Sequence, residues 1–149
     1  MENNYRLFAY EPEMLDACVH LYQDVFSGAP WYEQSDDADV RRLLEGFSGM
    51  NSFIGYVLND GERIIAFSIG FIKPYINGNE YYIDQFCVNP VYQGQGVGSF
   101  FMEQIKADLC IKGIHAAMLC TEAGYPAYGF YVKNGFSELA DTRFLVAEF

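Results

Sequence analysis

The stretch VNPVYQGQGVG, residues 88–98, lies between a predicted strand, residues 80–88, and a predicted helix, residues 98–112. Gly94, Gly96 and Gly98 carry no side chain, so a ligand can approach the backbone closely. The first amides of the following helix have no acceptor within the helix and carry about half a positive charge. The stretch therefore predicts an anion-binding loop. A tight turn with no ligand would require the same glycines.

Two other phosphate-binding motifs do not fit this loop. A P-loop needs a lysine followed by serine or threonine after its last glycine, and neither follows Gly98. A dinucleotide fingerprint needs the spacing Gly-x-Gly-x-x-Gly early in a βαβ unit, with an acidic residue about 20 positions further on. Neither condition is met, so both interpretations are set aside.

The predicted elements on either side of the loop indicate one α/β domain over residues 1–149. Hydrophobic periodicity predicts helices beginning at Pro12 and near Ser35, ending at Gly28 and Gly49, and a further helix at 126–134. Strands are predicted at residues 5–9, 52–58, 63–72, 80–88, 116–121, 138–140 and 143–149. We expect a mixed, mostly antiparallel sheet with helices on both faces, in which 116–121 is a parallel crossover strand.

The charged-residue composition limits the classes of molecule that the protein is expected to bind. The chain has 9 Lys and Arg against 20 Asp and Glu, a formal net charge of −11. This charge repels phosphate backbones, so nucleic-acid binding is not expected, and it attracts cations such as amines. A charge that serves only solubility is an equally good explanation.

The four cysteines and two histidines do not form a metal-binding pattern. Cys18, Cys87, Cys110 and Cys120 contain no CxxC pair, and each lies in a predicted helix or strand among apolar residues. We therefore expect buried free thiols in a reducing cytoplasm, and no metal site. No apolar run approaches the roughly 20 residues of a membrane span, so no membrane association is expected.

Two motifs in order resemble the GNAT N-acetyltransferase family. Residues 88–98 are similar to its acetyl-CoA signature, Gln/Arg-x-x-Gly-x-Gly/Ala after a strand. Residues 127–136, AYGFYVKNGF, are similar to its helix motif A-x-x-F-Y-x-K-x-G-F. The resemblance implies the acyl-CoA N-acyltransferase fold, with strands 80–88 and 116–121 splayed apart around the pantetheine arm of acetyl-CoA. The implied cofactor contacts are Phe86 and Val88 on the strand, then Gln93, Gly94, Gly96, Val97, Gly98 and Ser99.

The same resemblance implies the catalytic groups. Thioester-to-amine transfer needs a neutral amine, a donor for the oxyanion and a proton for the leaving thiolate. Tyr131 matches the tyrosine that serves as general acid, although a core tyrosine is the alternative. Asp84 is the candidate base, because Ile83-Asp84-Gln85 resembles the strand of aminoglycoside 6′-N-acetyltransferases. Strand alternation predicts that Asp84 shares a face with Phe86 and Val88. An aspartate bonded to a neighbouring loop is equally compatible.

Fewer residues indicate where the amine acceptor binds. Trp31 and Tyr32 fall in the family's acceptor-side loop, where aromatic rings beside acids could hold a cation. Tyr82 stands where histone-type members carry a glutamate, which argues against a histone-type site. Gly124 replaces an asparagine that contacts the cofactor in the family. The resemblance thus implies transfer of acetyl to a primary amine in a ternary complex, and the acceptor is a small molecule, with polycationic ones included, or a protein. The alternative is a non-catalytic acyl-CoA-binding regulatory module, and a homodimer is compatible with either.

Overall fold

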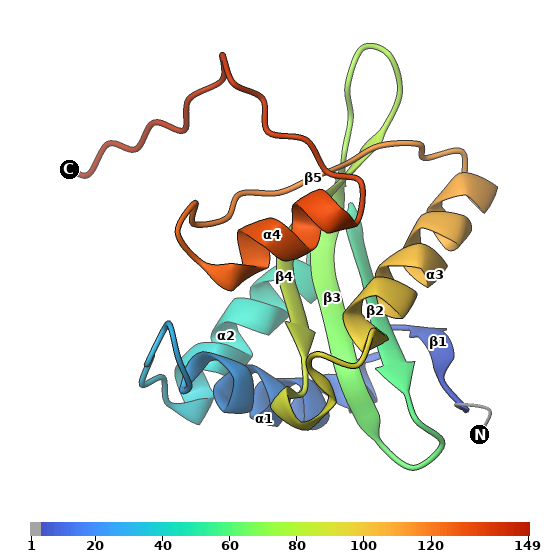
Figure 1. Cartoon of the computed structure of the whole chain (residues 1–149), viewed down its shortest axis with the longest axis vertical. Coiled ribbons are helices and arrows are strands. Elements are labelled where there is room, and N and C mark those ends of the chain that lie inside the picture. The colour runs from blue at the N-terminus through green and yellow to red at the C-terminus, as the bar shows by residue number, and fades with distance from the viewer. Residues whose placement is uncertain (1–3) are drawn as a thin grey trace.

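The structure, a computed structural model, describes residues 4–149. In chain order the described residues form the elements labelled in Figure 1: β1 (Arg6–Ala9), α1 (Leu15–Phe26), α2 (Asp37–Ser48), β2 (Phe53–Asn59), β3 (Ile64–Lys73), β4 (Glu80–Val88), α3 (Val97–Ile111), β5 (Ala117–Met118) and α4 (Pro126–Lys133). Short 3-10 turns at Pro12–Met14 and Pro90–Tyr92 precede α1 and α3.

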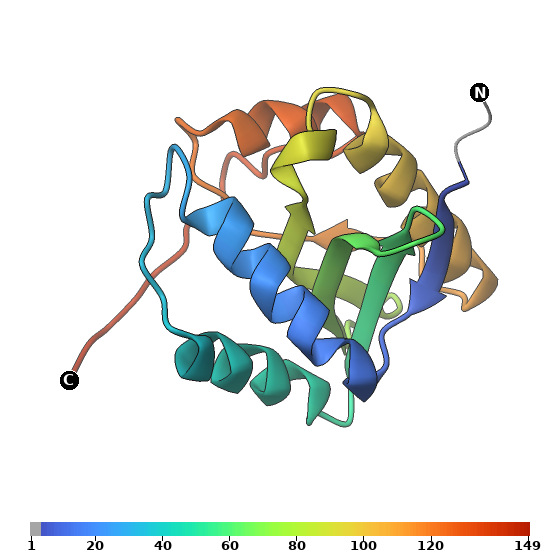
Figure 2. The same ribbon diagram turned by 90° about the horizontal axis from the view of Figure 1, so that it is seen from below.

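The strands form one sheet in the order β1-β2-β3-β4-β5, antiparallel except for the parallel pair β4–β5. Helices α1 and α2 cover one face, and α3 and α4 lie on the other (Figure 2). Each face has its own apolar core, one around Cys18, Leu44 and Phe67, the other around Tyr81 and Phe101. The predicted mixed sheet with helices on both faces is confirmed.

Local sequence signals account for the helix ends. The Asp36 side chain accepts a hydrogen bond of 2.9 Å from the Asp39 amide, so it caps α2 at the predicted position. Pro126 begins α4, where its missing amide costs no hydrogen bond. Gly135 follows α4 with a φ of 92°, the left-handed conformation that glycine adopts freely.

The predicted strands beyond α4 are wrong. Residues 138–140 and 143–149 form no strand; a turn closed by the Thr142 amide on the Leu139 carbonyl separates them. The parallel strand predicted at 116–121 is only two residues long. Apolar sequence predicts a capacity for strand formation, but a strand exists only where a second strand supplies hydrogen-bond partners.

Two of the four cysteines also differ from expectation. Cys18 and Cys87 are buried, but Cys110 and Cys120 are exposed. Cys110 lies on the solvent side of α3, and Cys120 lies just beyond the end of the short β5. Among residues 4–149 no cluster of three potential metal ligands occurs. None of the helices described is both long and apolar enough to cross a membrane.

A β-bulge interrupts β4 at Asp84. Along the β3–β4 ladder Ile69 lies opposite Gln85 and Gly70 lies opposite Ile83, which leaves Asp84 as the extra residue. A bulge shifts the alternation of side chains by one position. The face predicted for Asp84 from strand alternation is therefore wrong. In a regular strand Ile83 and Phe86 would lie on opposite faces, but both pack toward α3, as Val88 does, so the residues before and after Asp84 are out of phase.

We expect the substitution Gly70→Ala to destabilise the fold strongly. A methyl group at Gly70 would overlap the carbonyl oxygen of Tyr82 on β4, next to the bulge. The obstacle is backbone, which cannot rotate away, so the loss should be at least about 2 to 3 kcal/mol in the free energy of unfolding. Chemical denaturation followed by circular dichroism measures it.

The matched control is Gly46→Ala in α2. Nothing lies within 4 Å of a methyl group at that position, so the change should stabilise the helix by up to about 1 kcal/mol. Equal stability of the two variants would contradict the close approach of β3 to β4.

Candidate functional site

The parallel pairing of β4 with β5 ends early. The ladder contains Tyr81 opposite Ala117 and Tyr82 opposite Met118, and the Tyr81 amide donates to the Ala116 carbonyl at 2.9 Å. From Ile83 onward no strand of the described chain pairs with β4 on that side. The two strands therefore pair at one end only, and the edge of β4 from Ile83 to Val88 is left without a paired strand; this unpaired edge is the opening.

The bulge turns backbone amides into this opening. The Asn89 amide donates to the Ile65 carbonyl of the β3 side at 2.8 Å. Because successive amides of a strand point to opposite edges, the amides of Phe86 and Val88 point away from β3, into the opening. The Tyr81 amide also points away from β3, so in a regular strand continued from Tyr81 the Phe86 amide would point toward β3. The orientation of the Phe86 amide thus depends on the bulge at Asp84.

The glycine loop lies at the end of β4. Gly94 and Gly96 have φ values of 75° and 79°, and no atom lies within 4 Å of a methyl group placed on either. Gly96 precedes α3 without any side-chain cap. The first amides of α3 therefore have no side-chain acceptor among the described residues, and their binding of an anion stays a prediction. Gly98 differs, because a methyl group there would lie 3.0 Å from the Phe130 ring of α4.

Side chains fix the shape of this loop. Gln93 donates from Nε2 to the Val88 carbonyl at 3.0 Å, and its backbone amide donates to Pro90. Both donor groups of Gln93 hold the loop, so its contact with a phosphate stays a prediction. The Tyr92 hydroxyl donates to Asp60 Oδ2 in the β2–β3 turn at 2.6 Å. This hydrogen bond is the main reason that the pKa of Asp60 falls to about 2.

Tyr131 lies against the opening from α4. Its ring meets the Phe86 ring edge-on, with centroids 6.1 Å apart, and contacts Phe130 and Phe136 in the same way. Burial raises the pKa of Tyr131 above its ordinary value of 10.0, and no hydrogen bond to another described side chain contributes to that shift. A tyrosine that stays neutral is thus held against the Phe86 side chain, and the two motifs meet where Gly98 approaches the Phe130 ring.

Asp84 lies on the α1 side of the sheet, opposite the side on which Tyr131 packs. Its side chain is exposed and accepts a hydrogen bond of 3.0 Å from Gln85 Nε2, its neighbour in the bulge. Its charge contributes to the raised pKa of Tyr22 on α1, after burial and the hydrogen bond to Glu33. Asp84 is therefore on the α1 side of β4, while Phe86 and Tyr131 are on the α3–α4 side. The alternative role, a hydrogen bond from Asp84 to a neighbouring loop, is not present among the described residues.

The three predicted acceptor residues have different environments. Trp31 is half-buried between Phe26 of α1 and Tyr125, which precedes α4, with ring centroids 4.9 and 6.0 Å away. Tyr32 is exposed, with a φ of 47°. Tyr82 stacks on Phe71 and donates to Cys120 Sγ at 3.7 Å, and burial raises its pKa to about 12. Trp31 thus joins two loops beside the opening, and Tyr32 extends into solvent.

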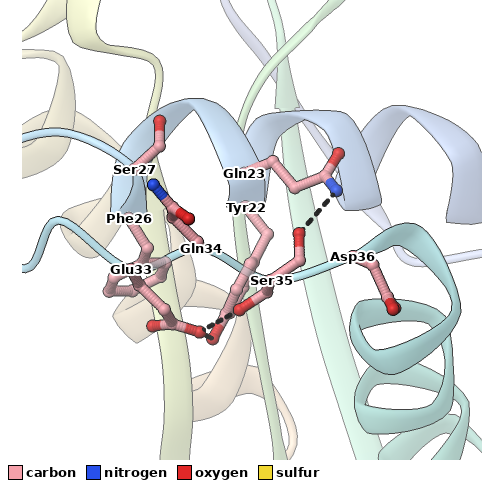
Figure 3. Close-up of a pocket in the computed structure, with 8 residues that line it drawn as sticks. All are labelled: Tyr22, Gln23, Phe26, Ser27, Glu33, Gln34, Ser35 and Asp36. Carbon is pink, nitrogen blue, oxygen red and sulfur yellow. Dashed lines mark hydrogen bonds between the residues drawn. The ribbon is translucent and has the colours of Figure 1, made fainter.

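Sequence reasoning missed a cavity of about 440 Å³ between α1 and the loop before α2 (Figure 3). At one end, Glu33 accepts hydrogen bonds from the Tyr22 hydroxyl at 3.0 Å and from the Ser35 hydroxyl at 2.5 Å. The lining contains two carboxylates, Glu33 and Asp36, and no lysine, arginine or histidine; its other members are Gln23, Phe26, Ser27 and Gln34. The charge of Glu33 also contributes to the raised pKa of Cys87, which connects this end of the cavity with β4. The sequence feature that could have indicated this cavity is Glu33, the acidic residue directly after Trp31-Tyr32.

Comparisons with known proteins agree with this geometry. The model of the acetyltransferase (GNAT) family matches residues 15–136, which include both motifs. No curated protein matches the sequence.

Solved structures share the fold across nearly the whole chain. A structure titled a possible acetyltransferase from Clostridium difficile has a TM-score of 0.81 at 16% identity and covers 97% of both chains. A transcriptional regulator from Bacillus halodurans has a TM-score of 0.75 at 21% identity, covering 97% of this chain and 99% of its own. An aminoglycoside antibiotic 6′-N-acetyltransferase from Acinetobacter haemolyticus has a TM-score of 0.74 at 11% identity, with the same coverage. At these identities the likeness concerns the fold alone.

Proposed function

The chain belongs to the acetyltransferase (GNAT) family, and we propose that it transfers the acetyl group of acetyl-CoA to a primary amine of a cationic small molecule by direct attack. A protein amine is the second acceptor class. The observation that carries the proposal is the arrangement of three features at one unpaired edge of the sheet: the Phe86 side chain packed against Tyr131, the end of the β4–β5 pairing, and the open glycine loop.

The donor side fits acetyl-CoA. The backbone at Gly94 and Gly96 leaves free space, and the amides at the start of α3 suit a pyrophosphate. Val97, Gly98 and Ser99 would supply those amides. Val88 and Phe86 line the edge where a pantetheine arm could take the place of a missing strand. The unpaired amide of Phe86 would donate to the thioester oxygen and stabilise negative charge there.

Two residues on opposite layers suit the proton transfers. Asp84, on the α1 side of β4, would accept a proton from the incoming ammonium group, directly or through water. Tyr131, on the α3–α4 side, would donate a proton to the departing thiolate. The amine would then approach from one face of the sheet edge while the thiol leaves on the other. This arrangement requires no covalent acyl-enzyme, and buried Cys87, whose pKa is raised, is a poor nucleophile.

The acidic cavity supports a cationic acceptor. Glu33 and Asp36 line it without a neighbouring cation in the lining, and the whole chain carries a charge of −11. Several amines on one molecule could contact Glu33, Asp84 and the Trp31-Tyr32-Tyr82 aromatic group together. Amino sugars of the kind that the Acinetobacter haemolyticus enzyme is titled for, and polyamines, belong to this class. We place the enzyme in a reducing cytoplasm on the basis of its four free cysteines.

The test is release of free thiol from acetyl-CoA with a panel of amines. We expect turnover with polycationic acceptors and little with a monoamine of similar size. Lysine peptides form a separate arm, and turnover with them alone would assign a protein acceptor. Binding of acetyl-CoA by calorimetry with no turnover for any amine would favour the non-catalytic acyl-CoA-binding module.

We expect the substitution Glu33→Gln to raise KM for a polycationic acceptor by about 10-fold, equivalent to about 1.4 kcal/mol, because it removes one charge from the cavity. KM for acetyl-CoA should stay unchanged, since the glycine loop lies elsewhere. Steady-state kinetics at low and moderate salt measure the effect, which should shrink as salt increases.

The control is Glu13→Gln, an exposed acid that does not line the cavity. It makes the same change in total charge. An equal rise of KM in both variants would show that only the net charge matters, and the cavity would then not be the acceptor site. Glu33 also accepts hydrogen bonds from Tyr22 and Ser35, so its replacement could destabilise the fold. Thermal melts of the variant test whether it stays folded.

A further inference from the structure

The turn between β2 and β3 is bonded to the segment that leads into the glycine loop. Both lie at the end of the sheet where β4 passes into α3 (Figure 1). Asp60 in the turn and Tyr92 before the loop are 32 positions apart, and the Tyr92 hydroxyl donates to Asp60 Oδ2 at 2.6 Å. We call this hydrogen bond the loop tether. Within residues 4–149 no other side-chain hydrogen bond joins residues 90–96 to a part of the chain more than five positions away.

The acceptor of the loop tether is fixed by its own turn. Asp60 Oδ1 accepts hydrogen bonds from the amides of Glu62 at 2.9 Å and Arg63 at 3.0 Å. The Asp60 amide in turn donates to the Arg63 carbonyl at 3.1 Å. One carboxylate oxygen therefore holds the turn, and the other accepts from Tyr92. An ionised carboxylate can accept all three hydrogen bonds at once, and hydrogen bonds to a charged acceptor are the stronger kind.

The donor of the loop tether is also held in place. Tyr92 ends the 3-10 turn Pro90–Tyr92, and its amide donates to the Asn89 carbonyl at 2.8 Å. Its ring meets the Tyr5 ring edge-on, with centroids 6.4 Å apart, and the Arg63 guanidinium lies 5.9 Å from its centroid. These ring contacts need no hydroxyl group. Removal of the hydroxyl alone therefore breaks the loop tether and leaves the packing of the ring in place.

The residues directly after Tyr92 have few contacts of their own. Gly94 and Gly96 have positive φ values, and no atom lies within 4 Å of a methyl group placed on either. Glycine has more conformational freedom than any other residue, so ordering this segment when a ligand binds costs conformational entropy. A loop that is already ordered before the ligand arrives binds it more tightly, because that cost is not subtracted from the binding free energy.

We propose that Tyr92 and Asp60 are positioning residues for the acetyl donor, whose hydrogen bond holds residues 93–96 in the shape that receives the pyrophosphate of acetyl-CoA. The inference rests on the proposed use of acetyl-CoA at the glycine loop. Neither residue is placed at the acetyl group or the amine. The loop tether should therefore set the affinity for donors that carry a pyrophosphate and leave the rate of acetyl transfer unchanged.

The charge of Asp60 acts in the opposite direction to the loop tether. A carboxylate near a pyrophosphate repels it, so neutralisation of Asp60 should tighten binding if charge alone mattered. Asp60→Ser separates the two effects. Serine keeps one oxygen that can accept from the amides of its own turn, but it lacks the second oxygen that accepts from Tyr92. Weaker binding of CoA by this variant supports the loop tether.

Calorimetry with CoA and steady-state kinetics with two acetyl donors test the loop tether. In Tyr92→Phe we expect Kd for CoA and KM for acetyl-CoA to rise about 10-fold, with kcat and KM for the amine unchanged. KM for S-acetylpantetheine, an acetyl donor without a pyrophosphate, should equal that of the wild type. Asp60→Ser should match Tyr92→Phe, and the double variant should be no worse than either single variant, because both remove one interaction.

The matched control is Tyr5→Phe. Tyr5 packs on the same ring, and its hydroxyl makes no hydrogen bond to another residue of the part that the structure describes. Its Kd for CoA should stay within about 2-fold of the wild type. Calorimetry needs no acceptor, so the result does not depend on acetyl transfer.

Equal affinity for CoA in Tyr92→Phe and the wild type would overturn the inference and leave the proposed function standing. Tighter binding in Asp60→Ser, or a parallel rise of KM for S-acetylpantetheine in Tyr92→Phe, would do the same. A wild type that binds no CoA would overturn the proposed function and the inference together.

Discussion

Replacing Tyr131 with phenylalanine is expected to lower kcat by about 100-fold or more, within the range of about 10² to 10⁴ for loss of a positioned proton donor. The ring contacts with Phe86, Phe130 and Phe136 need no hydroxyl group, so the opening should keep its shape. KM for acetyl-CoA should therefore change little. Steady-state kinetics with a saturating polycationic amine give both constants.

The pH profile adds an independent check on Tyr131. Burial raises its pKa above 10.0, so the hydroxyl stays protonated throughout the neutral range and up to pH 10. An activity loss centred below pH 10 in the wild type therefore cannot be the ionisation of Tyr131. In the phenylalanine variant the rate should depend on the pKa of the leaving thiol, and acyl donors with more acidic thiols should recover part of the lost activity.

Tyr128→Phe is the matched control, because Tyr128 lies on the same helix and donates to Glu138 at 3.0 Å. It should leave kcat within about 2-fold, as expected of surface changes. Unchanged turnover in the Tyr131 variant would rule out the general-acid role, while membership of the family would stand.

Asp84→Asn is expected to lower kcat/KM for the amine by about 100-fold at pH 7, because the amide cannot accept the ammonium proton. The size of the effect should depend on pH. Lysine-type amines have pKa values of about 10.4, so they become increasingly neutral as pH rises toward that value. The variant should recover toward the wild type at high pH, where little proton removal is needed. Rates measured from pH 6.5 to 9.5 resolve the recovery.

The control for this change is Glu80→Gln, at the start of the same strand and before the bulge. It removes an equal charge from β4 and should show no such pH dependence. A constant loss at every pH in the Asp84 variant would indicate that Asp84 binds the amine but does not deprotonate it. Full activity at all pH values would make a chain of water molecules the route for the proton.

The site was partly predictable because its donor half is local. The glycine loop, the following helix and the motif around Tyr131 are set by residues within a few positions of one another, and the structure has them as expected. The acceptor half was less predictable, because it forms where separate loops meet. The contact of Trp31 with Tyr125 and the approach of Glu33 to β4 join residues far apart in the chain.

By itself the sequence determined the helices, the antiparallel strands, the position of the glycine loop and the family, since capping residues, hydrophobic periodicity and glycine conformation act over short distances. Only the tertiary structure decided the bulge at Asp84, which depends on the register between β3 and β4 and directs the Phe86 amide into the opening. It also decided that residues 143–149 form no strand, although their apolar pattern is that of a strand. Strand pairing needs a partner edge, and a sequence does not specify which edge provides it.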